Sequence, residues 1–167
     1  RGESVWLAWF LCCIVIAWLP LARARGERDR ARAWEAALAG WRVALGSEAW
    51  DGAWFKRAFF DDGSALGSST QAEARIDLIA QAWSVLSDQT SPERQRQAMD
   101  EVEAQLVDPV HGLIRLLDPP LQNAQPSAGY IQAYPPGVRE NGGQYAHAGV
   151  WALMAAAALA QREPGNS

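Results

Sequence analysis

The sequence predicts an all-α fold in which buried helices alternate with amphipathic ones. Long apolar or amphipathic stretches have a helical period, capping residues mark breaks between them, and the non-helical stretches concentrate in two loops. The helices follow the order inner, outer, inner, outer, inner, without a recognisable repeat. A toroid of helical hairpins has this order, and so does a plain helical bundle.

The first expected helix is the run from Val5 to Ala22, which contains no charged side chain. Its length reaches the lower limit for a membrane-spanning helix, so a membrane segment with a soluble tail is one interpretation. Pro20 near its end, three tryptophans within it and the helix pair that follows favour another. A helix that is apolar all round suits the buried inner layer of a toroid.

The next two helices have opposite character. Residues 31–45 form an amphipathic helix that we expect on the outside, because its charged side chains face away from one apolar stripe. That stripe consists of Trp34, Leu38, Trp41 and Leu45. Residues 75–86, RIDLIAQAWSVL, are apolar over most of the circumference, so this helix is expected inside.

Capping residues mark the start of the fourth helix. Ser91 is typical of an N-cap, Pro92 of a first helical position and Glu93 of an acidic first turn. The apolar face of this helix carries Met99, Val102 and Leu106. The last helix is expected to begin near Gly143 and to be buried, since it is apolar through Val150, Trp151, Leu153 and Met154.

Two longer segments separate these helices. Residues 50–69 place Asp-Gly pairs around alternating aromatic residues, which predicts a short β-hairpin. Asp61 and Asp62 are expected to be turn residues there, because adjacent side chains on a hairpin point to opposite faces. Residues 111–143 are rich in Pro and Gly, and their length and aromatic content favour a functional loop. His111 has no second metal ligand nearby, so no metal site is expected.

The composition is that of a folded globular segment. Of 167 residues, 49% are hydrophobic and 20% are charged, and the net charge is −4. Nucleic-acid binding is disfavoured, because such proteins usually present a basic face. The adjacent residues Cys12 and Cys13 lie in an apolar run, where they are expected to be buried thiols in a reducing compartment.

Candidate chemistry lies in residues 129–151, GYIQAYPPGVRENGGQYAHAGVW. Polar and aromatic side chains converge there on a Gly-rich loop that leads into a helix: Tyr134, Arg139, Glu140, Asn141 and His147. Gly142 and Gly143 would let backbone N–H groups at the helix start point outward, where they favour an anion. One interpretation is therefore a phosphate site; the other is a plain turn with His147 as a core histidine.

This segment resembles the signature of the glycoside phosphorylase family of cellobiose and chitobiose phosphorylases, glycoside hydrolase family 94. The branch it is most similar to is the phosphorylase-like domain of cyclic β-1,2-glucan synthase. The resemblance is carried by residues 1–7 (RGESVWL), 51–58 (DGAWFKRA), 61–63, 66–68, 75–83 (RIDLIAQAW) and 134–145 (YPPGVRENGGQY). It implies that residues 1–167 are a fragment of one (α/α)6 catalytic domain, truncated at both ends.

The resemblance also implies the reaction and its site. An inverting phosphorylase uses a carboxylic acid to protonate the glycosidic oxygen while inorganic phosphate attacks the anomeric carbon from the opposite face. By the motif, His147 corresponds to the phosphate-binding histidine. Tyr134 and Arg139 correspond to sugar contacts, and Glu140 belongs to the same wall. No cofactor is expected, because phosphate is the co-substrate.

Three further residues could line a sugar cleft. Gln81 and Trp83 lie on an internal helix, and inner helices of a barrel can wall such a cleft. For Trp83, core packing is the default and stacking on a sugar is the alternative. Tyr130 stands where the cellobiose-cleaving branch has an acidic residue, which favours a β-1,2-glucan substrate.

Departures from the family pattern limit what this chain can do. The family's general acid is an aspartate in a Trp-Asn-Asp motif just upstream of the Arg-Gly-Glu-Ser segment, and the remaining phosphate contacts come from a loop after the last helix. Neither lies in this sequence, so the fragment is expected to be inactive alone. It also differs from the glucan-synthase branch at Gln132, Ala133, Ala146 and Gly149.

The residues leave two further functions open. The chain could be a non-catalytic carbohydrate-binding module, or part of a phosphorylase that acts on a cellobiose-like disaccharide. The expected partners are a β-glucan oligosaccharide, phosphate and the rest of the parent polypeptide, and a homodimer is possible. The domain is expected in the cytoplasm, in a parent that is either a free phosphorylase or bound to the inner membrane.

Overall fold

Helices form most of the computed structural model, which describes residues 2–162. The helices are α1 (Val5–Ala24), α2 (Arg28–Ser47), α3 (Leu78–Ser87), α4 (Pro92–Leu106), α5 (Tyr130–Ala133) and α6 (Ala146–Arg162). The strands are β1 (Glu3–Ser4), β2 (Ala58–Phe59), β3 (Ala65–Leu66), β4 (Ile76–Asp77), β5 (Val107–Asp108), β6 (Leu113–Ile114) and β7 (Leu117–Asp118). This arrangement is consistent with part of a helical toroid carrying a small hairpin.

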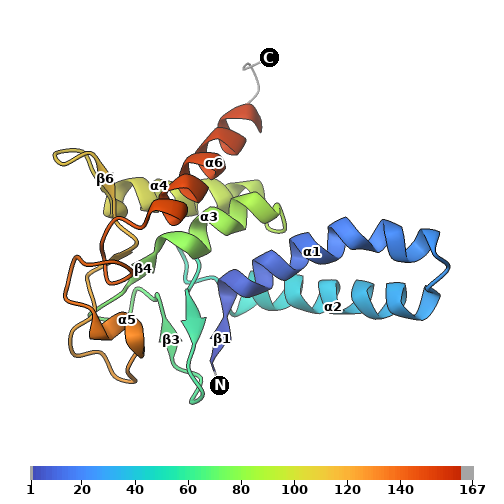
Figure 1. Cartoon of the computed structure of the whole chain (residues 1–167), viewed down its shortest axis with the longest axis horizontal. Coiled ribbons are helices and arrows are strands. Elements are labelled where there is room, and N and C mark those ends of the chain that lie inside the picture. The colour runs from blue at the N-terminus through green and yellow to red at the C-terminus, as the bar shows by residue number, and fades with distance from the viewer. Residues whose placement is uncertain (1, 163–167) are drawn as a thin grey trace.

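Helices α1 and α2 form a hairpin that projects from the rest of the molecule (Figure 1). The Ser4 hydroxyl caps α1 by accepting a hydrogen bond from the Leu7 N–H group at 3.3 Å. The buried stripe of α1 consists of Val5, Trp9, Cys12, Val15 and Ala22. On α2 the predicted amphipathic pattern is confirmed, since Leu38 and Leu45 are buried and Trp34 packs against the same core.

The prediction that the first helix is buried all round is wrong for the described residues. Its other face leaves Leu7, Ile14, Trp18 and Leu21 between 39% and 53% exposed. The reason is geometric, because α2 and α3 cover α1 from one side only. Helix α1 also has the length and hydropathy of a membrane span, a property that core helices of soluble proteins share.

The predicted hairpin is confirmed. Strands β2 and β3 pair antiparallel, and β1 adds a third strand through the Glu3–Phe59 pair. Asp62 stabilises the turn between β2 and β3, because its carboxylate accepts hydrogen bonds from the Ser64 N–H group at 2.9 Å and hydroxyl at 2.6 Å. These bonds lower the pKa of Asp62, as expected for a turn residue.

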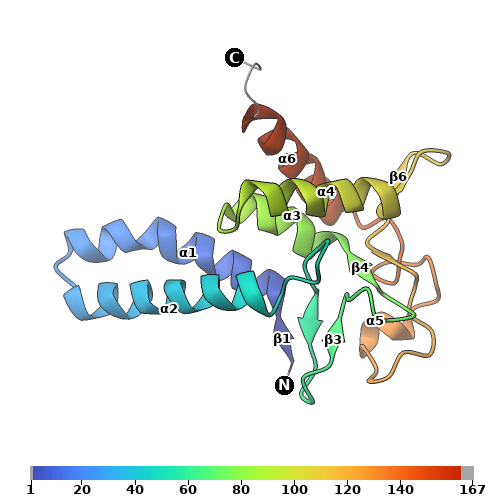
Figure 2. The same ribbon diagram turned by 180° about the vertical axis from the view of Figure 1, so that it is seen from behind.

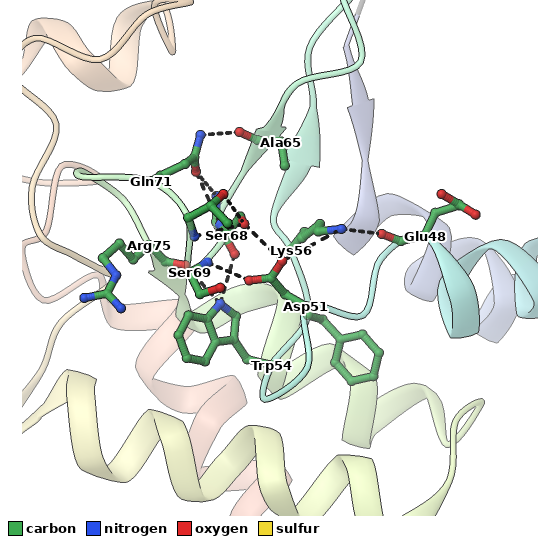
Figure 3. A network of polar contacts seen from close by, with 12 residues as sticks. Glu48, Asp51, Trp54, Lys56, Ala65, Ser68, Ser69, Gln71 and Arg75 are labelled. Carbon is green, nitrogen blue, oxygen red and sulfur yellow. Dashed lines mark hydrogen bonds and ion pairs between the residues drawn. The ribbon is translucent and has the colours of Figure 1, made fainter.

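A polar network fastens the segments around this hairpin to one another (Figure 3). The Asp51 carboxylate accepts hydrogen bonds from the Ser68 hydroxyl at 3.0 Å and the Ser69 N–H group at 2.6 Å. The Trp54 indole donates to the carbonyls of Gly67 and Arg75, at 3.0 and 2.9 Å. The hairpin is thereby tied to the segment that leads into α3.

Helix α3 is the central helix, as its apolar sequence predicts. It packs against α1, α4 and α6, and eight of its ten residues are buried. It begins at Leu78 rather than at residue 75, because Ile76 and Asp77 pair with Asp118 and Leu117 of β7. The backbone of these two residues is therefore engaged in the pairing with β7 and is not available for an earlier helical turn.

The remaining helices follow the predicted order with shifted limits. Ser91 caps α4 through the Arg94 N–H group at 3.3 Å, and Pro92 is its first residue, as predicted. Helix α6 begins at Ala146, three residues later than expected. It buries only Ala148, Ala152 and Ala155, whereas Val150, Leu153 and Met154 are more than half exposed. The prediction that this helix is buried is therefore wrong for most of its surface. Small residues let α6 approach α3 closely, and of its bulky side chains Trp151 packs against Trp83 of α3.

Candidate functional site

A cavity of about 170 Å³ lies where three helices begin. Trp6 comes from the first turn of α1, Ile79 from the first turn of α3, and His147 from the first turn of α6. In Figure 1 the three helices start near the centre of the molecule and run outward from it. The starts of α1 and α3 are capped by Ser4 and Asp77. Because a helix N-terminus carries partial positive charge, the start of α6 is the end that can favour a negatively charged group in this cavity.

His147 is exposed and borders the cavity, so it is not a core histidine. Its ring lies edge-to-face against Tyr145, with centroids 4.3 Å apart, and against Trp151, with centroids 5.0 Å apart. The imidazole therefore contacts one aromatic ring that precedes it in the sequence and one that follows it. The predicted position of His147 on the first turn of the last helix is confirmed.

The predicted anion cradle at Gly142 and Gly143 is wrong. Gly143 donates its N–H group to the Arg139 carbonyl at 3.1 Å, and both glycines are buried in the loop. A Cβ atom on Gly143 would lie only 2.8 Å from that carbonyl oxygen. The glycines are needed for a tight turn instead, because the loop folds back on itself before the helix begins.

The helix start supplies other N–H groups. The Gly149 N–H group donates to the Tyr145 carbonyl at 3.0 Å and so forms the first bond of α6. The N–H groups of residues 146–148 precede that bond and have no partner within the helix. They belong to the same first turn as the His147 ring. The first turn of this helix thus lies three residues further along than the sequence suggested.

Asn141 holds the loop in shape, a role that sequence reasoning treated only as a turn or cap. Its side chain is fully buried. The amide accepts from the Leu121 N–H group at 2.7 Å and donates to the carbonyls of Leu121 and Tyr134, at 2.8 and 2.7 Å. It thereby connects three parts of the long loop immediately next to Glu140.

Glu140 presents a carboxylate at the cavity wall. Its side chain is 14% exposed, and its Oε2 atom is buried without a hydrogen-bond partner among residues 2–162. The Arg139 guanidinium lies 3.7 Å from that oxygen. Desolvation raises the pKa of Tyr145, and the hydrogen bond between its phenol and Glu140 acts in the same direction. A ligand hydroxyl would satisfy the Oε2 atom.

Tyr134 and Arg139 lie beside the cavity and do not border it. The Arg139 guanidinium stacks 5.1 Å from the centre of the Tyr134 ring, which in turn meets Tyr130 edge-on at 6.3 Å. Tyr130 does border the cavity and is 65% exposed. The loop therefore brings Tyr130, Glu140 and His147 together and leaves the other two predicted residues in the next layer.

Gln81 does not reach the cavity, contrary to its proposed role as a sugar contact. Its side chain is fully buried, and the amide accepts from the Phe55 N–H group at 2.8 Å. The same amide donates to the carbonyls of Phe55 at 2.8 Å and Asp77 at 2.9 Å. The two bonds to Phe55 attach the segment of the predicted β-hairpin to α3, and the bond to Asp77 stays at the start of α3 itself.

Sequence reasoning missed an ion pair in the cavity wall. Arg57 Nε lies 3.2 Å from Asp77 Oδ2, and its Nη1 group donates to the Ser4 hydroxyl at 3.1 Å. Asp77 also caps α3 by accepting from the Ile79 N–H group at 2.9 Å. Burial raises the pKa of Asp77, and the Arg57 charge opposes that shift. The sequence contained one signal for Asp77: an aspartate directly before an apolar helix is a favourable N-cap.

Comparison with known proteins identifies the family. The model of the glycosyl hydrolase 94 superfamily catalytic domain matches residues 1–164. The chain belongs to this superfamily. The family prediction is thereby confirmed over nearly the whole sequence, including Arg1, which lies outside the described residues.

Several members of the glycosyl hydrolase 94 superfamily are similar to this chain. Cyclic β-(1,2)-glucan synthase NdvB of Rhizobium meliloti is 49% identical over 163 residues, which are 98% of this chain and 6% of that protein. Solabiose phosphorylase of Paenibacillus borealis is 34% identical over 157 residues, 93% of this chain and 20% of that protein. N,N'-diacetylchitobiose phosphorylase of Vibrio furnissii is 32% identical over 160 residues, with 95% and 20% covered.

The chain spans only a small part of these relatives, about a fifth of the two phosphorylases and 6% of the synthase. The relatives establish a family of carbohydrate-active enzymes for this domain. Among residues 2–162, no group of three His, Cys, Asp or Glu side chains is placed to hold a metal ion.

Proposed function

We propose that this chain is part of an inverting glycoside phosphorylase-type catalytic domain that acts on β-linked glucan, with a β-1,2 linkage. The observation that carries the proposal is the cavity at the starts of α1, α3 and α6, with His147 at its edge. The printed names of the relatives, a β-(1,2)-glucan synthase and several phosphorylases, support both the substrate class and the use of phosphate.

The phosphate would occupy the end of the cavity next to α6. The His147 imidazole can donate a hydrogen bond to a phosphate oxygen, and the N–H groups of residues 146–148 offer donors from the same turn. The N-terminus of α6 adds a favourable field for the phosphate charge. In the reaction, a phosphate oxygen attacks the anomeric carbon as the bond from that carbon to the glycosidic oxygen breaks.

The sugar would bind against the loop side of the cavity. Glu140 offers a buried carboxylate oxygen that can accept from a sugar hydroxyl, and Tyr130 borders the same space. Arg139 and Tyr134 would meet the part of the sugar that extends beyond the cavity, because they stack on each other next to Tyr130. Gln81 has no part in this proposal.

The proton for the leaving glycosidic oxygen is proposed to come from an aspartate outside residues 1–167. We therefore expect the isolated chain to bind ligands without turnover. The proposal includes no cofactor, because phosphate is a co-substrate of the reaction. The parent polypeptide would hold the domain in the cytoplasm, either as a free phosphorylase that can form dimers or as part of a synthase at the inner membrane.

Phosphate binding by the 167-residue chain tests the site directly, because the chain contains only two histidines. We expect inorganic phosphate, followed by calorimetry and by imidazole NMR signals, to perturb His147 and to bind at least about tenfold more weakly to His147→Ala. His111→Ala is the matched control, since its ring pairs with Asp108 at 2.9 Å on an exposed loop. Equal affinity of the wild type and His147→Ala would contradict the assignment.

Turnover requires the longer polypeptide with the upstream aspartate. Incubation with a β-1,2-glucan oligosaccharide and phosphate should release glucose 1-phosphate, and the same polypeptide with His147→Ala should release almost none. Unchanged release by that variant would refute the site. Sugar binding without any phosphorolysis by the unaltered polypeptide would instead favour a non-catalytic carbohydrate-binding module.

A further inference from the structure

Two tryptophan rings form one wall of the cavity beside His147. Trp6 and Trp151 both border the cavity, and their rings stack with centroids 6.0 Å apart at an angle of 27°. Trp6 lies in the first turn of α1, and Trp151 lies one turn beyond His147 on α6. Residues far apart in the sequence thus contribute neighbouring ring surfaces to the same space.

The cavity combines this aromatic wall with polar groups. Glu140 and His147 provide polar atoms at the same cavity, whereas the indole rings of Trp6 and Trp151 add aromatic groups to its lining. A pyranose ring has a matching division, with an apolar C–H face and a rim of hydroxyl groups. A site with aromatic surface and a few converging polar groups is suited to such a ligand.

We propose that Trp6 and Trp151 are the stacking platform for one sugar ring, which lies against them while its hydroxyl groups reach Glu140. This inference rests on the proposed function, and it adds two residues that no motif assigned to substrate. It also places the sugar next to the phosphate, because the Trp151 ring touches the His147 imidazole.

Trp83 supports this platform from behind. Its ring meets Trp6 edge-on at 6.4 Å and Trp151 edge-on at 5.3 Å, and it does not border the cavity. Phe10 packs edge-on against Trp83 at 5.4 Å on the side of α1. The position of Trp83 thus supports core packing rather than sugar stacking.

The size of the cavity limits the ligand to a single ring at this wall. Its volume of about 170 Å³ is below the range of roughly 300–1,000 Å³ that is usual for drug-sized ligands. The next ring of a glucan chain would therefore lie outside this cavity, on the side where Arg139 and Tyr134 stack next to Tyr130.

Binding of a β-1,2-linked glucose disaccharide to the 167-residue chain tests the platform. We expect Trp6→Leu and Trp151→Leu to weaken disaccharide binding by about five- to tenfold in calorimetry, while Trp151→Phe stays within about threefold of the wild type. Inorganic phosphate should bind Trp6→Leu and Trp151→Phe within about twofold of the wild type, because both variants keep an aromatic ring beside His147. Trp83→Phe, which removes no cavity-lining group, is the matched control and should bind the disaccharide like the wild type.

Three results would count against the platform. Loss of disaccharide binding in Trp83→Phe equal to that in Trp151→Leu would show that the cluster acts only through packing. No disaccharide binding by the wild type, or unchanged binding by both Leu variants, would also refute it. If the Leu variants fail to fold by circular dichroism, Trp151→Phe decides, because sugar binding must then quench less tryptophan fluorescence than in the wild type.

The proposed function and this inference fail separately. Phosphate binding that depends on His147, together with sugar binding that ignores Trp6 and Trp151, would leave the phosphorylase proposal standing and remove the platform. Sugar binding that depends on the two tryptophans, without phosphate binding, would support the platform and contradict the phosphorylase proposal.

Discussion

The centre of the molecule and the projecting α1–α2 hairpin differ in which side chains they bury: the centre buries polar groups, and the hairpin exposes apolar ones. Near the helix starts, the charged or amide groups of Arg57, Asp77 and Asn141 are largely or fully buried, and each has named partners. Along the projecting hairpin, ion pairs such as Arg23 with Glu35 are exposed, and one face of α1 is apolar and uncovered. In Figure 2 the α1–α2 hairpin extends to one side of the central region in which the helices start.

This difference indicates where geometry matters. A buried polar group has to be matched by partners in defined positions, so it fixes the relative placement of the segments it joins. An exposed ion pair contributes little and tolerates change. The centre therefore contains the interactions that position the cavity, and the hairpin contains apolar surface that residues 2–162 leave uncovered.

Removing the charge of Arg57 should have the largest effect. Arg57→Met leaves the Asp77 carboxylate buried without its partner, and breaking a buried pair in this way costs about 3–5 kcal/mol. Chemical denaturation should show this loss in the free energy of unfolding. Arg23→Met on the hairpin is the matched control and should change it by less than about 1 kcal/mol.

The double variant Arg57→Met/Asp77→Asn sharpens the Arg57 test. Asparagine can still cap α3, and it removes the buried charge, so part of the lost stability should return. A double variant no more stable than Arg57→Met would mean that the arginine acts through packing and not through its charge.

Removing the amide of Asn141 should have the next largest effect. Asn141→Leu leaves the N–H and carbonyl groups of Leu121 and the carbonyl of Tyr134 without this partner. With about 1–3 kcal/mol for each buried group left unsatisfied, we expect a loss of at least about 2 kcal/mol. Proteolysis should become faster within residues 121–141 first, and cleavage confined to the α1–α2 hairpin would contradict this account.

Changing the uncovered face of α1 should have the smallest effect on folding. Trp18→Gln and Leu21→Gln are expected to alter the free energy of unfolding by no more than about 0.5 kcal/mol, because both side chains are about half exposed. They should reduce self-association of the chain in sedimentation experiments, since they break up an apolar surface. A large loss of stability in either variant would show that this face is packed in solution.

The repeating patterns of the chain predicted most of the helices and the hairpin. The apolar stripe of residues 31–45, the cap at Ser91 and the turn at Asp62 depend on near neighbours in the sequence, and all three were correct. The helix starts at Leu78 and Ala146 were misplaced by about one turn. In both places backbone groups bond to distant or folded-back segments, which no local pattern reveals.

The same distinction between local and long-range features applies to the residues of the candidate site. The motif placed His147 on the first turn of the last helix, as the structure has it, because a Gly-rich entry and a following apolar run are local features. The roles of Gln81, Gly143 and Asn141 depended on which atoms each side chain or N–H group meets, and those partners come from other segments. The pairing of Arg57 with Asp77 joins positions 20 residues apart in the same way.

By itself the sequence determined the helical class, the family and the position of the histidine, because these depend on short-range periodicity and on contiguous motifs. Only the tertiary structure decided which N–H groups bond within the loop, which carboxylate is paired, and which tryptophans border a cavity and which stand behind it. The physical reason is that hydrogen bonds and ring contacts act over a few ångströms in space, whatever the separation of their residues along the chain.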